Sequence, residues 1–155
     1  MNISEKGFNF IKAHEKRRLK AEKNDAGIWT TGYGHTESVR EGDSVTPEEA
    51  EALLISDLKK CADVLRQKLG VPVSQNQFDA LCSLLLSIGP GLRGVKSGPI
   101  ELKSGQPSTL LMFLNQGCYA AAADQFGSWI YAGNTVIKEL IYRREREKNL
   151  FLRKK

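Results

Sequence analysis

The stretch HEKRRLKAEKNDAGIWTTGYGHT, residues 14–36, decides how this chain is interpreted. It opens with a carboxylate at Glu15, continues through a dense run of charges, and ends in a short segment with glycines at alternate positions. A segment of this kind is typical of a β-hairpin that follows a helix. It also suits the edge of an enzyme cleft, because a strand with little side-chain bulk lets a ligand approach the backbone.

A helix is expected directly before this stretch. Ser4 is a suitable N-cap, and Phe8, Ile11 and Glu15 follow it at positions i, i+3 and i+7 of one helix face. We therefore expect Glu15 at the C-terminal end of this helix, on its apolar side. Burial there would raise the pKa of the carboxyl group and suit it to donate a proton. The alternative is a surface glutamate paired with a neighbouring basic residue.

Residues 23–36 are predicted to form the hairpin. NDAG supplies the turn, and Gly27 can adopt the positive φ that such a turn needs. Side chains alternate along the strand that follows, so one face is bulky while the other carries only Thr30, Gly32 and Gly34. We expect this second face to be bare and open to a large ligand.

Two capping boxes mark the next helices. TPEE at residues 46–49 places a proline at the first helical position, and an apolar stripe then runs to Gly70. SQNQ at residues 74–77 repeats the box ahead of FDALCSLLLSIG. Because that helix is apolar on nearly every side, we expect it at the buried centre of the fold.

The second half of the chain is predicted to hold a loop and three helices. Residues 89–107 are rich in Gly, Pro and Lys and too long for an ordinary connector, so a surface loop is expected, with a functional role left open. A helix should begin at Ser108 and stop at Gly117. Residues 119–133 are expected to form an alanine-rich helix, and a last amphipathic helix should run from about Thr135 to Phe151.

These elements predict an α+β fold that is mostly helical. We expect one domain over residues 1–155, with a small hairpin lobe at about 15–45 and a larger helical lobe at about 46–155, on which the first helix packs. A lone hairpin of this size is not stable by itself, so it must lean on the helical lobe. A cleft between the two lobes would be a common place for a ligand.

The formal net charge of +5 and the pI of about 9.2 favour a polyanionic partner such as nucleic acid, an anionic membrane or an anionic cell wall. Charge alone does not choose among these. Much of it lies in RREREKNLFLRKK near the C-terminus, which we interpret as a solvated helix face.

No run of about 18 apolar residues predicts a membrane span, and the N-terminal residues lack the apolar stretch of a signal peptide. We therefore expect a chain that stays in the cytosol of the producing cell without stable membrane insertion. Cys61, Cys82 and Cys118 are odd in number and lack metal-ligand spacing, so they are expected to be reduced core thiols.

The constellation around Glu15 resembles the phage-type lysozymes, glycoside hydrolase family 24, which include the phage endolysins. That family has a glutamate at the end of its first helix, a variable polar residue nine positions later, and a closing Gly-x-x-Thr-[Ile/Val]-Gly-[Tyr/Ile/His]-Gly-His. Later segments, among them TPEEAEALLISDL, SQNQFDALCSLLLSIGPG and RREREKNLFL, also match in order, so the resemblance covers essentially the whole length. The matching residues are Glu15, Leu19, Gly27, Thr30, Gly32, Tyr33, Gly34, His35 and Thr36, with Asn24 at the position that is usually Asp.

The resemblance implies a two-lobed, lysozyme-like fold and hydrolysis of the β-1,4 bond between N-acetylmuramic acid and N-acetylglucosamine in peptidoglycan, with inversion. Such chemistry needs a proton donor and a second group that activates or positions water. Glu15 would be the general acid. Asn24, or Asp25 if the turn rotates it inward, would position the water together with Thr30.

The remaining site residues receive supporting roles from the same resemblance. Gly32 and Gly34 would leave space for sugar rings, with Asp25 also close to substrate. Tyr33 and His35 are expected to pack the hairpin onto its neighbour. Peptidoglycan strands are the expected partner of a monomeric enzyme, with no nucleic acid, metal or organic cofactor.

Several positions at the site depart from the family pattern. An amide at Asn24 cannot act as a general base, although it can hold a water. Lys16 stands where glycine is usual and would favour ionised Glu15, but its side chain is flexible enough to point to water, so we expect burial to prevail. The other departures are Arg17 for an apolar residue, Glu22 for Tyr, Thr31 for Ile or Val, and Ser87 for Asn.

These departures leave two alternatives to an active enzyme. One is a catalytically inactive lysozyme-like domain that binds glycan or another protein. The other is a basic helical nucleic-acid binder, which would need a recognition helix or an aromatic stacking platform. The C-terminal basic helix offers neither feature clearly.

Overall fold

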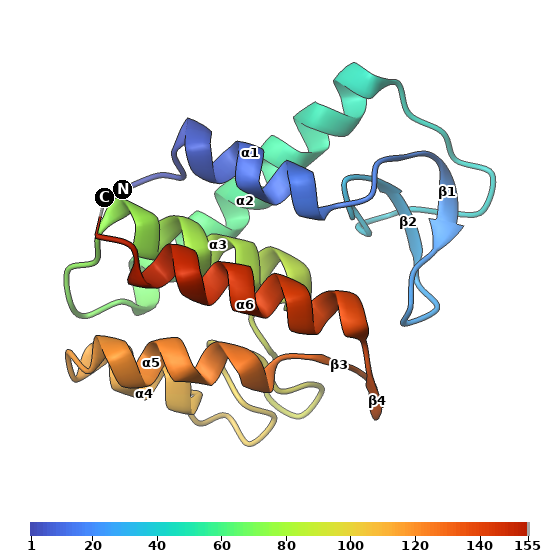
Figure 1. The fold of residues 1–155 in the computed structure, drawn as a ribbon. Coiled ribbons are helices and arrows are strands. Elements are labelled where there is room, and N and C mark those ends of the chain that lie inside the picture. The colour runs from blue at the N-terminus through green and yellow to red at the C-terminus, as the bar shows by residue number, and fades with distance from the viewer. Residues whose placement is uncertain (155) are drawn as a thin grey trace.

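Helices dominate the fold, with a β-hairpin near the N-terminus that extends to one side of them (Figure 1). The computed structural model describes residues 1–154. This arrangement confirms the predicted α+β, mostly helical class. The elements are α1 (Glu5–His14), β1 (Arg18–Lys23), β2 (Trp29–Gly32), α2 (Pro47–Lys68), α3 (Gln75–Ile88), α4 (Thr109–Asn115), α5 (Tyr119–Asp124), the 3₁₀ helix η1 (Gln125–Ser128), β3 (Tyr131–Ala132), β4 (Thr135–Val136) and α6 (Lys138–Leu152).

Four helices begin where their capping residues predict. The Ser4 side chain accepts a hydrogen bond from the Gly7 amide, and the Ser108 side chain caps α4 in the same way. Both predicted capping boxes form, at Thr46 for α2 and at Ser74 for α3. These ends could be predicted because a cap depends only on residues within one turn.

The central helix is α3, as its all-round apolar sequence predicts. Its residues from Phe78 to Leu85 are all buried, and it packs most extensively against α6. In Figure 1, α1 and α2 lie above this pair, and α4 and α5 lie below it. The core therefore runs through the helical part of the chain, and the β1–β2 hairpin is supported mainly through contacts of β2 with α2.

The hairpin differs from its predicted form in two respects. Strand β2 ends at Gly32, so Gly34 lies beyond the strand and does not share an alternating face with Thr30. The face expected to be bare is covered, since Thr30 is only 1% exposed. The reason is close packing on α2: a Cβ added to Gly32 would lie 3.2 Å from the Cα of Ala50.

The segment 119–133 is not one helix, and that prediction is wrong. Helix α5 ends at Asp124, a 3₁₀ turn follows, and the chain then forms a second small hairpin in which β3 pairs antiparallel with β4. Gly133 adopts a φ of +61° at the tip. The Gly-Asn pair at this tip is a hairpin signal that the alanine-rich run obscured.

Two further predictions fail at the level of burial. Cys82 is buried and Cys61 partly so, with burial raising the pKa of the Cys61 thiol to about 12, but Cys118 is exposed. The C-terminal basic run is not simply a solvated face, because Arg143, Arg144 and Glu147 are buried.

Residues 89–107 form the expected loop without a helix or strand. Among the described residues, no helix combines the length and apolarity that a membrane crossing requires.

Candidate active site

Glu15 stands immediately after α1, as its C-cap, and not within the helix. Its backbone is extended, and its N–H donates to the carbonyls of Ile11 and Lys12. The side chain of Glu15 is mostly shielded from solvent, with 15% of it exposed.

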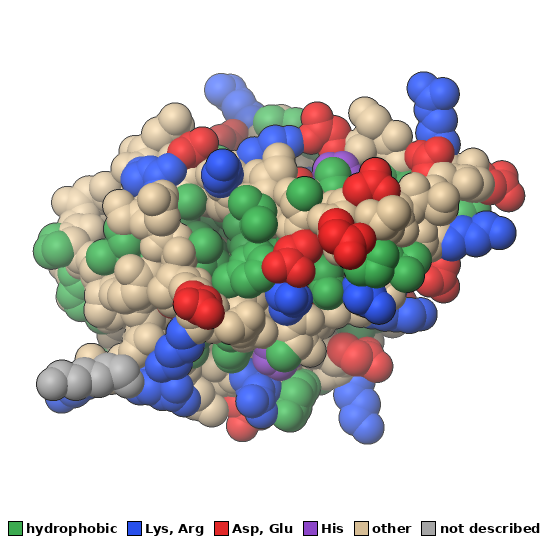
Figure 2. Space-filling model, turned by 90° about the horizontal axis from the view of Figure 1, so that it is seen from above, with side chains coloured by type: hydrophobic (Ala, Val, Ile, Leu, Met, Phe, Trp, Pro, Cys, Tyr) green, Lys and Arg blue, Asp and Glu red, His purple; other side chains and the backbone are tan. Residues whose placement is uncertain are grey.

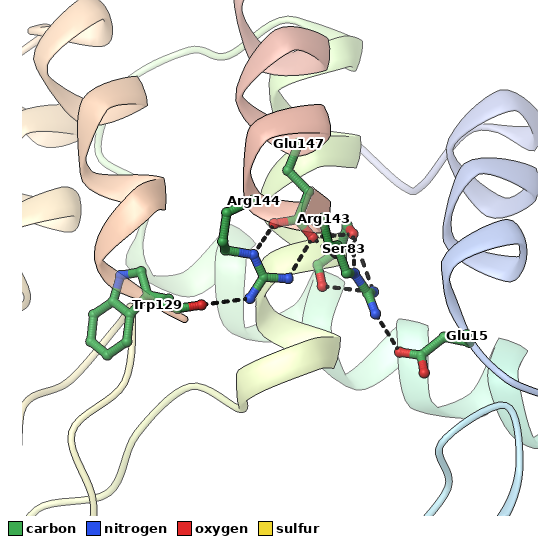
Figure 3. Close-up of polar contacts among 6 residues, drawn as sticks. All are labelled: Glu15, Ser83, Trp129, Arg143, Arg144 and Glu147. Atoms are coloured by element: carbon green, nitrogen blue, oxygen red, sulfur yellow. Dashed lines mark hydrogen bonds and ion pairs between the residues drawn. The ribbon is translucent and has the colours of Figure 1, made fainter. Parts of the chain in front are cut away.

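The neighbour of the carboxylate is a guanidinium. Arg143 Nη1 donates to Glu15 Oε1 over 2.8 Å, from α6 to the end of α1 (Figure 3). The predicted apolar setting of Glu15 is therefore wrong, because its carboxylate contacts a charged partner. Burial opposes the charge on Arg143, but Glu15 and Glu147 outweigh it and raise the pKa of Arg143.

Behind Arg143 lies a buried cluster that joins α6 to α3 (Figure 3). Glu147, which is 0% exposed, accepts from Arg143 Nε at 3.2 Å and from Arg144 Nη2 at 2.9 Å, and it also accepts from the Ser83 hydroxyl. Arg143 Nη2 donates to the Ser83 carbonyl at 3.2 Å, and Arg144 Nη1 to the Trp129 carbonyl at 3.2 Å. Burial lowers the pKa of Arg144, although Glu147 partly offsets this.

This cluster was missed because the basic run looks like a surface helix. Its signal is the spacing of Leu140, Arg143, Glu147 and Leu150, which repeats at i, i+3, i+7 and i+10 and puts two charged residues on the apolar stripe. A charge at a stripe position indicates a buried ion pair when an opposite charge lies one turn away.

Gly34 faces the other oxygen of Glu15. Its φ is +86°, and a Cβ at this position would lie 3.1 Å from Glu15 Oε2. Gly34 thus keeps one side of the carboxylate clear while Arg143 holds the other. The two oxygens therefore have different environments, with Oε1 in the ion pair and Oε2 beside bare backbone.

Asn24 and Asp25 occupy the turn of the first hairpin. Asn24 Oδ1 accepts from the backbone amides of Ala26 at 2.9 Å and Ile28 at 3.0 Å, so the amide oxygen holds the turn together. Within residues 1–154 the Nδ2 group of Asn24 makes no hydrogen bond, and Asp25 is exposed. Gly27 has the expected positive φ, at +77°.

Thr30 is the next predicted site residue. Its hydroxyl donates to the Ile28 carbonyl at 3.0 Å, so the hydroxyl oxygen has only lone pairs left to offer a water. Lys16 points to solvent as expected, with 68% of its side chain exposed and Nζ 3.7 Å from Glu22 Oε1.

His35 joins the hairpin segment to α2. His35 Nδ1 lies 2.9 Å from Asp57 Oδ2, and the backbones of His35 and Thr31 exchange two hydrogen bonds of 2.9 Å. Tyr33 packs against the core, and Lys12 Nζ lies 5.7 Å from the centroid of its ring. Both residues therefore contact neighbours outside the hairpin.

His14 lies beside the site, between Phe10 and Tyr142, with ring centroids at 4.8 and 6.1 Å. Burial, followed by the positive charges of Arg143 and two further arginines, lowers the pKa of His14 to about 4. The imidazole next to Glu15 is therefore neutral at pH 7. Over residues 1–154 no group of three His, Cys, Asp or Glu side chains is placed to hold a metal ion.

Comparison with known proteins identifies the family of the chain. The Phage lysozyme family model matches residues 12–147. The chain is 41% identical to the endolysin of Acyrthosiphon pisum secondary endosymbiont phage 1, over 97% of this chain and 98% of that protein. It is 40% identical to the endolysin of Salmonella phage P22, over 98% of this chain and 99% of that protein.

Solved structures give the same assignment. A mutant of P22 lysozyme superposes with a TM-score of 0.75 at 39% identity, covering 99% of both chains. The muramidase domain of SpmX from Asticaccaulis excentricus superposes with a TM-score of 0.79 at 36% identity, covering 98% of both chains. The chain therefore belongs to the phage lysozyme family, the lysozyme-type glycoside hydrolases that act on peptidoglycan.

Proposed function

We propose that Glu15 is the general acid in cleavage of the β-1,4 bond between N-acetylmuramic acid and N-acetylglucosamine. The observation that carries this proposal is the asymmetric setting of its carboxylate, with Oε1 held by Arg143 and Oε2 beside Gly34. A proton on Oε2 would face the open side. When that proton moves to the leaving oxygen, the carboxylate left behind is stabilised by Arg143, which favours the transfer.

The second catalytic role is proposed for the hairpin turn. Inverting hydrolysis needs a water on the far side of the sugar ring, between two groups about 6.5–9.5 Å apart. Asn24 can donate from Nδ2 but cannot take a proton, and its oxygen is used by the turn. Asp25 is the carboxylate on the same turn, so we assign it the base role. Because Thr30 is only 1% exposed, we assign its hydroxyl to holding the strand beside this turn, through its hydrogen bond to the Ile28 carbonyl.

The substrate is proposed to lie against Gly34 and the hairpin, with Tyr33 and His35 holding that segment in place. Gly32 supports the site indirectly, because it lets β2 approach α2. The enzyme is proposed to act as a monomer on glycan strands after release from the producing cell. The route to the wall varies among relatives, since a protein named SAR-endolysin, of Enterobacteria phage P21, is 34% identical over 84% of this chain.

The decisive experiment compares Glu15→Gln with the wild-type chain on purified peptidoglycan, measuring new reducing ends. Removing a general acid should lower the rate by about 10²–10⁴-fold. Asp25→Asn and Asn24→Ala, run alongside, separate a base from a turn residue: the first should lower kcat, and the second should mainly lower stability. If wild type and Glu15→Gln release sugar equally slowly, the chain is an inactive binding domain.

A further inference from the structure

We propose that Glu147 is a positioning residue that acts on Glu15 through Arg143. It fixes the direction in which the Arg143 guanidinium points, and its negative charge sets the net charge of the buried cluster beside Glu15. This inference rests on the proposed role of Glu15 as general acid. Glu147 does not contact substrate, since its side chain is fully buried.

The first argument is geometric. A guanidinium is a rigid planar fork, so fixing two of its edges determines where the third points. Glu147 holds the Nε edge of Arg143 at 3.2 Å, and the Ser83 carbonyl holds Nη2 at 3.2 Å. Nη1 is thereby aimed at Glu15 (Figure 3). Without Glu147, the guanidinium could rotate and release the Glu15 oxygen.

The second argument is the charge balance. Arg143 and Arg144 supply two positive charges, while Glu15 and Glu147 supply two negative charges in the same cluster. If Glu147 is replaced by a neutral residue, two guanidinium groups face one carboxylate, and Glu15 should lose its proton at a lower pH. If Arg144 is replaced by a neutral residue instead, the cluster loses a positive charge, and Glu15 should keep its proton up to a higher pH.

Other charged groups near the cluster are accounted for. On the α1 side His14 is neutral at pH 7, and Lys16 extends into solvent. On α5, Asp124 pairs with Lys148 at 2.8 Å on the surface of α6. On α3, the carboxylate of Asp79 accepts from the amide of Ser4.

The test is the pH profile of kcat/KM for Glu147→Gln and Arg144→Gln, measured on purified peptidoglycan. The alkaline limb reports loss of the proton from the general acid of the free enzyme. We expect Glu147→Gln to move this limb to lower pH by about one unit and Arg144→Gln to move it to higher pH by a similar amount. A merely structural role would lower the amplitude of both variants without opposite shifts.

Asp124→Asn is the matched control. It changes the net charge by the same amount as Glu147→Gln, but at a side chain that is 69% exposed, so its alkaline limb should coincide with that of the wild type. Circular dichroism checks that each variant is folded at the assay temperature. If one of the two cluster variants fails to fold, the other still tests the proposal, because the direction in which its alkaline limb should move is fixed in advance.

Limbs that coincide with the wild type, or that move in the same direction in both variants, would overturn the proposal. The function itself is tested separately by Glu15→Gln. A variant at position 15 that is inactive, combined with unshifted limbs at positions 144 and 147, would leave Glu15 as the acid and remove only the role of Glu147.

Discussion

At the residue scale, Gly34 and Gly27 differ in what a Cβ added to each of them would contact. Both have a positive φ, +86° and +77°, so alanine should cost each about 1 kcal/mol of unfolding free energy. A Cβ at Gly34 would press on Glu15 Oε2, whereas at Gly27 nothing lies within 4 Å. Gly34→Ala should therefore lose activity by at least about 10-fold, a shift of one oxygen being enough to disturb proton transfer. Gly27→Ala should keep it.

Thermal melts and rates on peptidoglycan measure the two effects separately. Equal loss of activity in both alanine variants would show that strain in the hairpin, and not contact with Glu15, explains the result.

His14 makes stability depend on pH. Its pKa is about 4 in the fold against an ordinary value of 6.5, so the unfolded chain binds the proton more readily. The free energy of unfolding should hold steady above pH 6.5, fall as the pH drops from 6.5 to about 4, and change no further from this residue below that. Because the ring is partly exposed, the loss should be of order 1 kcal/mol.

Urea unfolding at a series of pH values tests this for the wild type and His14→Asn. The difference between the two curves should appear over that window. A constant difference across the whole range would contradict the assigned pKa.

Glu15 could be found from sequence because a local pattern surrounds it, but its pairing with Arg143 could not. The two residues are 128 positions apart, and the ion pair exists only once α6 packs beside α1. The same distance explains the error about the surroundings of Glu15: helical spacing gives a face, while the partner on that face is set by tertiary packing.

At the element scale, the capping serine Ser74 can be compared with a serine in a loop, Ser104. The Ser74 side chain accepts from the Gln77 amide at the start of the central helix, so Ser74→Ala should lower the unfolding free energy by about 1 kcal/mol. Ser104→Ala is the control, because its hydroxyl accepts only a 3.3 Å bond in an exposed loop, and it should change stability by less than about 0.5 kcal/mol. Denaturant melts of both variants measure the difference; equal losses would contradict the capping role.

Elements that begin at a cap were predicted well, whereas elements interrupted by a tight turn were not. The segment 119–133 has strong helix propensity, yet its helix stops at Asp124 and the Gly-Asn turn forms a second hairpin. Strand β2 stops at Gly32 because the chain turns back there, pairing Thr31 with His35. In both cases a tight local turn interrupts the regular pattern of the preceding residues.

At the scale of the whole molecule, the formal net charge is +5. Figure 2 shows the molecule from above, and on this face the Lys and Arg side chains are spread out and mixed with Asp and Glu. A diffuse positive charge would attract an anionic wall through long-range forces that salt screens over about 8–10 Å near physiological ionic strength. Lysis of outer-membrane-permeabilised cells should therefore slow as salt rises, whereas hydrolysis of a short, uncharged glycan should change little. Equal salt sensitivity of both substrates would exclude this role for the charge.

The central claim, that Glu15 gives its proton to the departing sugar, is tested most directly by changing the leaving group. The rates of wild type and Glu15→Gln are compared on peptidoglycan and on an aryl glycoside of the same disaccharide, whose phenol departs without a proton. The account predicts a loss of about 10²–10⁴-fold on peptidoglycan and a loss of less than about 10-fold on the aryl glycoside. An equally large loss on both substrates would contradict it.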